Sequence, residues 1–524
     1  MSEIRARGRR GHARSDRQAA RRAPLPPELR PVRPGLEGGA YKPLTASEMD
    51  RVHTAALEVL ENIGIANAIP SCVQRIEALG GRLTEEGRLL FPRSLVEDTV
   101  ASAARNFVLH ARDAQHDLDL SGTRVHFSTA GAAVHMVDPQ TRAYRDTTLA
   151  DLYDISRLVD TLDNVHMFQR SVVARDLVDP REMDLNTCYT ALAGTRKHVG
   201  TSWVEPDHVR ESVAMLHMIA GCEKKWRERP FVSMSNCFVV PPLRFAEDAC
   251  RCLEVAVESG MPVLLLAAGQ AGATSPASLA GALVQEVAEV LAGLVYVNAI
   301  VPGAKAIFGT WPFISDLRTG AMSGGSGEQA VLMAACAQMS SFYDLPGGVA
   351  AGMADSKLPD AQSGLEKAYT TVLAGQAGAN IVYESAGMLA SLLGCCLESF
   401  VIDNDMLGAV LRTIRGIEIT EQSLSIDAMR DVCIGGPNHY LGHGQTMELM
   451  QKDYFYPEVA DRLSPKEWVE KGSRDMIEKA RDRVQQVLSS HYPEYIDPAL
   501  DQKLRAAFPI RLPADIMNSA STRW

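Results

Sequence analysis

No two of the ten cysteines form a Cys-x-x-Cys pair in this 524-residue sequence, which argues against a four-cysteine zinc module. No apolar run approaches the roughly 20 residues that a membrane span needs. No apolar segment follows the basic N-terminus, as one would in a secretory signal. The net charge of −11 is the opposite of what a nucleic-acid-binding protein usually carries. These absences indicate a soluble cytoplasmic protein with no nucleic-acid and no membrane partner, and its 46% of hydrophobic residues suffice for a large core.

The N-terminus differs from the rest of the chain in composition. Eight arginines fall within the first 22 residues, and a proline-rich stretch follows at 23–31. We expect residues 1–34 to form a disordered basic and proline-rich arm, because blocks of like charge are usually solvated. Two alternatives are an organellar transit peptide and an arm that docks on an acidic partner or a neighbouring subunit.

Short β-rich runs recur along the middle of the chain with helix-like segments between most of them. Eight such units of about 30–40 residues are typical of an α/β protein with a (β/α)8 TIM-type barrel, which we place at residues 124–400. A doubly wound sheet is the competing fold, but the early Gly-x-Gly-x-x-Gly that marks it is missing. The β-rich runs lie near residues 126, 167, 199, 233, 264, 307, 349 and 382.

Shorter patterns describe the two flanks of this barrel. Thr45 and Glu48 have the spacing of a capping box, and apolar residues follow at helical intervals. We expect an N-terminal helical and β-hairpin extension over residues 35–123, and a further hairpin arm that turns at 138–141. Residues 401–524, with a charged helical stretch at 465–489, should form a C-terminal helical region packed on the barrel.

Functional residues of such barrels come from the carboxyl ends of the strands and the loops that follow. Here these positions combine aromatic residues and carboxylates with few histidines. Aromatic faces beside a carboxylate are the usual cage for a quaternary or tertiary ammonium group. The positions are Ser128, Thr129, Gln169, Arg170, Ser202, Trp203, Glu205, Ser235, Asn236, Gln270, Trp311, Asp316, Arg318, Met353, Asp355, Ser356, Lys357, Tyr383, Glu384 and Ser385.

Two other patterns are weak candidates for chemistry. His439 and His443 are four residues apart and could share a helix face as metal ligands, but no third ligand is evident, so we expect no metal. Lys357 could be a Schiff-base lysine after a strand. With Asp355 close by, an ion pair or an anchor for a substrate carboxylate is the better interpretation.

Several motifs after residue 315 occur in a fixed order and spacing. None is diagnostic alone, and the order is what makes the set specific. They are Asp-Leu-Arg-Thr-Gly-Ala-Met-Ser-Gly-Gly-Ser-Gly-Glu at 316–328, Gly-Met-Ala-Asp-Ser-Lys at 352–357, Pro-Asp-Ala-Gln at 359–362, Glu366-Lys367, His-Tyr-Leu-Gly-His at 439–443 and the segment around Trp468.

These motifs resemble the trimethylamine methyltransferase family over about residues 36–510. The resemblance implies a barrel enzyme that moves a methyl group from an amine to the cobalt of a corrinoid protein or cobalamin. Members that use trimethylamine carry pyrrolysine near the position of Met353, where this chain has an ordinary residue that we do not expect to react. The resemblance therefore implies the non-pyrrolysine branch, which acts on quaternary amines such as glycine betaine and releases the tertiary amine, here dimethylglycine.

Cobalt(I) attacks a methyl carbon in line, and a quaternary ammonium leaves as a neutral amine without acid, base or metal. The protein must then orient one N-methyl group and exclude water. We expect two subsites. The cage candidates are Trp203, Trp311, Tyr383 and Glu384; the carboxylate anchor is Arg318 or Lys357, with Asp355 beside it.

The alternatives come from different classes. One is the same chemistry on carnitine, γ-butyrobetaine, proline betaine or trimethylamine. A second is a zinc-dependent methyltransferase that uses His439 and His443, and a third is a non-catalytic betaine-binding protein. We expect no tightly bound cofactor, a corrinoid protein as partner and methyl acceptor, and a homo-oligomer.

Overall fold

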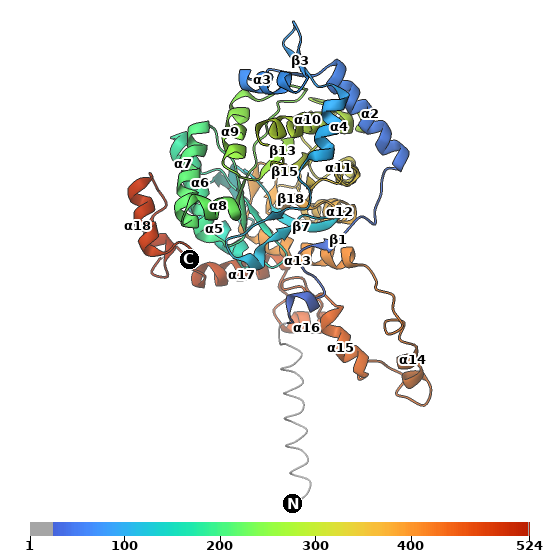
Figure 1. Ribbon diagram of the computed structural model, residues 1–524. Coiled ribbons are helices and arrows are strands. Elements are labelled where there is room, and N and C mark those ends of the chain that lie inside the picture. The colour runs from blue at the N-terminus through green and yellow to red at the C-terminus, as the bar shows by residue number, and fades with distance from the viewer. Residues whose placement is uncertain (1–24, 522) are drawn as a thin grey trace, which may run out of the picture.

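Eight parallel strands close into a barrel in the computed structural model, which describes residues 25–521 and 523–524 (Figure 1). Each strand pairs with the next, β18 pairs with β7, and a bridge from Phe308 to Gly347 joins β15 to β17. The (β/α)8 fold is confirmed, and all eight predicted runs are its strands. The strands are β7 (Arg124–Thr129), β10 (Met167–Gln169), β11 (His198–Thr201), β12 (Val232–Met234), β13 (Val263–Ala267), β15 (Ala306–Thr310), β17 (Gly348–Ala350) and β18 (Ile381–Ala386).

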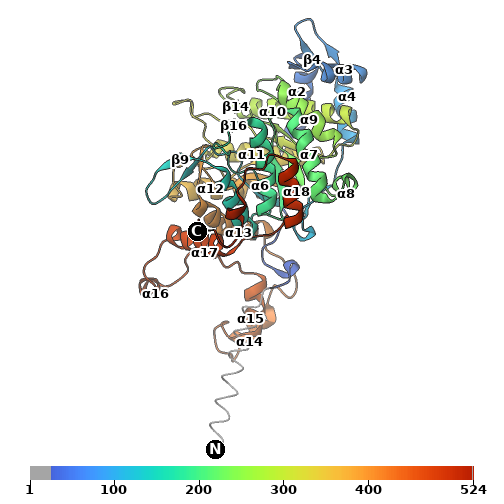
Figure 2. The same cartoon turned by 90° about the vertical axis from the view of Figure 1, so that its left-hand side faces the viewer.

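A helix follows every barrel strand and lies outside it (Figures 1 and 2). The expectation that no apolar run approaches the length of a membrane span was wrong for one segment. Among the described residues, α10 is the one helix long and apolar enough to cross a membrane, but 83% of its apolar window is buried in this fold. Its composition is thus that of a core helix. The eight helices are α5 (Leu149–Asp160), α6 (Pro180–Gly194), α7 (Pro206–Ala220), α9 (Glu247–Glu258), α10 (Leu279–Ile300), α11 (Gly327–Phe342), α12 (Ala361–Gln376) and α13 (Leu397–Arg415).

The N-terminal segment packs against the barrel and the helices around it. Its first strand pairs with β7, and the predicted capping box of Thr45 and Glu48 is present at the start of α2. Arg30 pairs with Asp163, so the end of the predicted arm contacts the barrel; residues 1–24 of that arm lie outside the described residues. The elements are β1 (Leu36–Glu37), α2 (Ala46–Asn62), β2 (Ile65–Ala66), α3 (Pro70–Ala78), β3 (Arg82–Leu83), β4 (Arg88–Leu90), α4 (Arg93–Ser102), β5 (Val108–Leu109) and β6 (Leu118–Asp119).

A small four-stranded sheet, which we call the roof sheet, is built from segments that follow β7 and β18. The predicted hairpin is present, and its first strand pairs with a strand from the far end of the barrel segment. A further two-stranded ribbon follows β13 and β15. The roof sheet contains β8 (His135–Val137), β9 (Tyr144–Asp146), β19 (Met388–Leu389) and β20 (Gly394–Cys395), and the ribbon contains β14 (Gln270–Ala271) and β16 (Phe313–Ile314).

The C-terminal region is helical, but its predicted stretch at 465–489 is two helices. They separate near Gly472, which has a positive φ of 91°. The segment 416–452 projects away from the barrel (Figures 1 and 2) and leaves Ile417 and Leu441 85% and 81% exposed. A second copy could cover such side chains, and the expected homo-oligomer stays a prediction. The helices are α14 (Ile426–Cys433), α15 (Gly444–Lys452), α16 (Pro465–Glu470), α17 (Met476–Ser490) and α18 (Pro498–Ala507).

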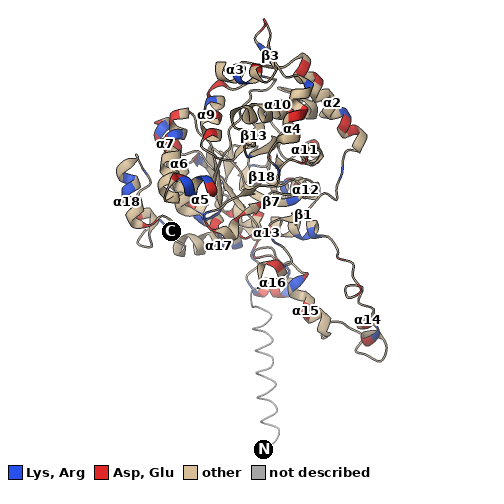
Figure 3. Cartoon of the chain, viewed as in Figure 1, with Lys and Arg blue, Asp and Glu red and all other residues tan. Residues whose placement is uncertain are grey.

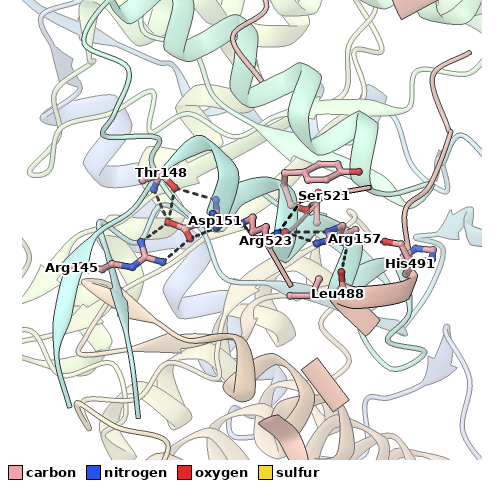
Figure 4. Close-up of polar contacts among 11 residues, drawn as sticks. Arg145, Thr148, Asp151, Arg157, Leu488, His491, Ser521 and Arg523 are labelled. Carbon is pink, nitrogen blue, oxygen red and sulfur yellow. Dashed lines mark hydrogen bonds and ion pairs between the residues drawn. The ribbon is translucent and has the colours of Figure 1, made fainter. Parts of the chain in front are cut away.

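Hydrogen bonds of Arg157 and an ion pair of Arg523 fasten the C-terminal region to α5 (Figure 4). Arg157, 1% exposed, donates to the carboxylate of Asp154 and to the carbonyls of Leu488 and His491 at 2.8 and 3.0 Å. Arg523 contacts Asp154 as well. Because every charge here has a partner, the cluster stabilises the docked C-terminus rather than marking a site.

We expect Arg157→Met to destabilise the protein by about 3 kcal/mol, because it leaves one buried and one partly buried carbonyl without this donor and weakens the pairing of Asp154. Limited proteolysis should release the segment after residue 475 before the barrel is cut. Arg210→Met is the control, since Arg210 and its partner Asp207 are 60% and 82% exposed and such pairs contribute little. Equal protease resistance of both variants would contradict this account.

Candidate functional site

The carboxyl face of the barrel is open on one side and covered on the other. Arg170, Ser202 and Ser235, which directly follow β10, β11 and β12, keep partial solvent access, although the strands themselves are buried. Trp311 and Ala351, which follow β15 and β17, are 6% and 0% exposed. The carboxyl face is therefore more accessible to solvent after β10–β12 than after β15 and β17.

Trp311 and Tyr383 form an aromatic pair on the covered side. Their ring centroids lie 5.2 Å apart at an angle of 46°. The indole N–H of Trp311 donates to the carbonyl of Gly348 at 3.1 Å, which fixes the ring. Burial raises the pKa of Tyr383, and its hydroxyl has no hydrogen-bond partner among the described residues. The sequence predicted both residues for the cage, and the structure brings them together.

Glu384 follows Tyr383 directly and is only 3% exposed. Arg124 and Glu384 are the only Lys, Arg, Asp or Glu residues in the eight barrel strands; most charged residues lie on the outer helices and loops (Figure 3). The backbone N–H of Gly131, after β7, donates to both carboxyl oxygens of Glu384 at 3.1 Å. Burial nevertheless raises the pKa of Glu384 to about 8.

The backbone at Glu384 departs from a regular strand. Its φ is +63°, a left-handed conformation that side chains other than glycine adopt at a cost. The register between β18 and β7 shifts between Val382 and Ala386, as in a β-bulge. Bulges beside active sites re-aim a side chain, and here the bulge carries the single buried acid of the barrel strands.

Met353 lies in the segment that connects β17 to its helix and is fully buried. Gly352 before it has a φ of +103°, and a Cβ added there would come 2.7 Å from the Cα of Ser385. Only glycine therefore allows this close approach to β18. The side chain of Met353 packs against Gly324.

Asp355 connects the segments that cover the carboxyl face of the barrel next to β15 and β17. Its carboxylate accepts hydrogen bonds from the hydroxyls of Ser323 and Ser391 at 2.7 and 2.6 Å and from the N–H of Gly324 at 2.8 Å. These donors come from the loop before α11 and from the turn of the roof sheet. Because these hydrogen bonds occupy its carboxylate oxygens, Asp355 holds the covering segments together.

The other predicted residues do not join the aromatic pair. Arg318 is 88% exposed and pairs with Asp316 through two hydrogen bonds, at 3.0 and 2.8 Å. Lys357 is exposed and its ammonium donates to the carbonyl of Asp355 at 2.7 Å. The indole of Trp203 donates to Ser212 on α7 at 2.8 Å.

The two histidines proposed as weak metal candidates belong to the projecting segment. His439 is exposed, and His443 caps α15 by accepting the N–H of Gln445 at 3.2 Å. Within residues 25–521 and 523–524, no three His, Cys, Asp or Glu side chains are grouped so that they could hold a metal ion.

Two buried acids that were not among the predicted residues hold the loops after β13 and β12. Glu286, on α10, accepts the N–H of Gly269, and Glu289 accepts the N–H of Leu243 at 2.7 Å. Burial raises both pKa values, that of Glu289 to about 7. Two glutamates three residues apart in an otherwise uncharged helix were the signal that could have identified them.

The chain is similar to known proteins over most of its length. A family model described as trimethylamine methyltransferase matches residues 6–514. The trimethylamine methyltransferase MttB of Methanosarcina thermophila is 33% identical over 481 residues, which cover 90% of this chain and 98% of that protein. The glycine betaine methyltransferase of Desulfitobacterium hafniense (strain Y51) is 29% identical over 467 residues, with coverage of 89% and 96%. Among solved structures, the monomethylamine methyltransferase MtmB of Methanosarcina barkeri overlays with a TM-score of 0.49 at 12% identity, over 88% of this chain and 90% of that one.

The raised pKa of Glu384 has a consequence for stability. Between about pH 4.5 and 8 the folded protein keeps a proton on this carboxyl that the unfolded chain releases, so stability falls as the pH rises through this window. We expect Glu384→Gln, which cannot ionise, to remove this contribution. The melting temperature of the variant should rise relative to the unmodified protein as the pH goes from 5 to 8. A constant difference between the two melting curves across this range would show that Glu384 ionises normally.

Proposed function

Because the chain belongs to the trimethylamine methyltransferase family, we propose that it takes a methyl group from a quaternary amine, with glycine betaine as the best candidate, and gives it to the cobalt(I) of a corrinoid protein or cobalamin. The tertiary amine, dimethylglycine, is released. The observation that carries this proposal is the buried Trp311–Tyr383 pair, with the buried acid Glu384 as the residue directly after Tyr383. The D. hafniense relative named glycine betaine methyltransferase adds weaker support for the substrate.

The chemistry suits a site with these residues. The corrinoid supplies the nucleophile, and a quaternary ammonium needs no activation because it leaves as a neutral amine. Trp311 and Tyr383 can hold the cation by their faces, and the carboxyl of Glu384 can ionise against it when the cation is bound. Met353, where the resemblance implies pyrrolysine in relatives, offers no electrophile, which favours a quaternary amine over trimethylamine.

The same proposal includes the route by which the methyl acceptor reaches the site and the protein that carries it. The partly exposed residues that follow β10, β11 and β12 favour approach from this side by a corrinoid that another protein holds. We therefore propose a corrinoid protein as a partner, with no cofactor held tightly by this chain, and a cytoplasmic location.

The test is a spectroscopic methyl-transfer assay with the purified protein and chemically reduced cobalamin. Glycine betaine should consume the cobalt(I) absorbance and yield methylcobalamin and dimethylglycine. Carnitine, γ-butyrobetaine, proline betaine and trimethylamine should be slower. Faster turnover of one of these would keep the reaction and replace the substrate. Binding of betaine with no transfer to cobalamin or to a candidate corrinoid protein would favour a non-catalytic binding protein, and zinc-dependent transfer would favour the metal alternative.

Replacement of Trp311 tests the cage. We expect Trp311→Ala to raise KM for glycine betaine by about 5- to 30-fold, which corresponds to ~1–2 kcal/mol for a desolvated cation–π contact. Trp311→Phe keeps an aromatic face and should raise this KM less. Trp468→Ala is the matched control, because Trp468 is 36% exposed on α16. An unchanged KM in Trp311→Ala would remove Trp311 from the site.

A further inference from the structure

We propose that Arg170 binds the carboxylate of the substrate and so restricts this site to quaternary amines that also carry an anionic group. The inference rests on the proposed function, since it assigns the second subsite of that site. It gives the anchor role to a residue on the open side of the barrel, in place of Arg318 or Lys357.

Arg170 is held at the mouth by its backbone. It follows β10 directly, its N–H donates to the carbonyl of Gly200 at 2.9 Å, and its own carbonyl accepts the N–H of Ala132 at 2.7 Å. The residue is thus fixed between the ends of two neighbouring strands, β11 and β7. A side chain that starts from so rigid a position is suited to orient a ligand.

The guanidinium of Arg170 has no protein partner. Its five N–H donors make no hydrogen bond and no ion pair with any residue in 25–521 or 523–524. Residue 170 keeps partial solvent access, yet burial lowers the pKa of its guanidinium. Arg157, the buried arginine under the C-terminus, has all its contacts within the protein. An unpaired desolvated guanidinium is costly, which points to an anion that arrives with a ligand.

Asp184, whose negative charge partly offsets the lowering of the Arg170 pKa, is not the anion that pairs with Arg170. The carboxylate of Asp184 accepts the N–H of Val204 at 2.8 Å and contacts the Nδ1 of His208 at 2.7 Å. It forms no ion pair with Arg170 among the described contacts. Asp184 therefore stabilises the positive charge at a distance and leaves the donors of Arg170 free.

The position of Arg170 relative to Glu384 sets the kind of ligand. A Cβ added to Gly131 would lie 3.4 Å from Oε1 of Glu384 and 3.7 Å from the carbonyl of Arg170. The carboxyl of Glu384 and the backbone of Arg170 thus flank one residue. A compact zwitterion, with one or a few carbons between ammonium and carboxylate, would fit between that carboxyl and a guanidinium that extends from this backbone position. Arginine binds a carboxylate through two parallel hydrogen bonds.

The experiment compares glycine betaine with choline, which has the same trimethylammonium head and a hydroxyl in place of the carboxylate. We expect Arg170→Gln to raise KM for glycine betaine by about 10- to 100-fold with little change in kcat, since a charged hydrogen-bonded pair is lost. Arg170→Lys should be intermediate. Choline should be a poor substrate of the unmodified enzyme, and its KM should not change in the variant. Arg175→Gln, which removes a 41% exposed arginine of the same loop, is the matched control.

Two outcomes would overturn the inference. One is an unchanged KM for glycine betaine in Arg170→Gln, or a raised KM for glycine betaine in Arg318→Gln instead. The other is an effect on the methyl acceptor, because the phosphodiester of a corrinoid is a second source of an anion. Cobinamide lacks that phosphodiester. If Arg170→Gln raised the KM for cobalamin but not for cobinamide, Arg170 would be assigned to binding of the acceptor.

Calorimetry separates this inference from the proposed function. If no amine methylates cobalamin, glycine betaine should still bind the unmodified protein more tightly than choline does, and Arg170→Gln should abolish that preference. Arg170-dependent binding without transfer would support the anchor while the methyl-transfer proposal fails. Absence of any betaine binding would overturn the anchor as well.

Discussion

The pairing of β18 with β7 closes the sheet and joins the two ends of the barrel segment. Gly131 and Glu384, whose contact forms the acidic part of the candidate site, are 253 positions apart in the chain. The aromatic pair and the roof sheet likewise combine residues from distant strands. Because these contacts exist only in the closed barrel, the site cannot form before the first and last strands meet.

Buried ionisable groups with an opposite charge in contact differ in role from buried groups without one: the first are structural, the second functional. Lys367 and Asp403 are 1% and 5% exposed and lie 2.6 Å apart, and Arg157 is paired in the same way under the C-terminus. Glu384 and Arg170 have no opposite charge in contact within the described residues, although both pKa values are shifted by burial. Burial without a counter-charge keeps the carboxyl of Glu384 protonated and leaves the guanidinium of Arg170 uncompensated, which is unfavourable for folding alone. A zwitterionic ligand would compensate both groups at once.

The sequence was sufficient to predict the barrel, because eight β-rich runs at regular spacing have few alternative arrangements. It also indicated Trp311, Tyr383 and Glu384 as cage candidates; the structure places Trp311 directly after β15 and the other two within β18, and their role in binding stays a prediction. The strand-end rule does not give the direction of a side chain. Arg318 turns to Asp316 two residues away, and Trp203 turns to Ser212 on the following helix. The left-handed backbone of Glu384 depends on a register shift that no local pattern indicates.

That left-handed conformation has an evolutionary consequence. Glycine would relieve the backbone at position 384, and a single base change converts a glutamate codon into a glycine codon. In a lineage released from selection for the reaction, this replacement would be among the first to spread, because it eases the strand and removes a buried acid together. A glutamate that persists at such a position is a signature of retained chemistry. Relatives could be sorted by it even where the overall resemblance is low.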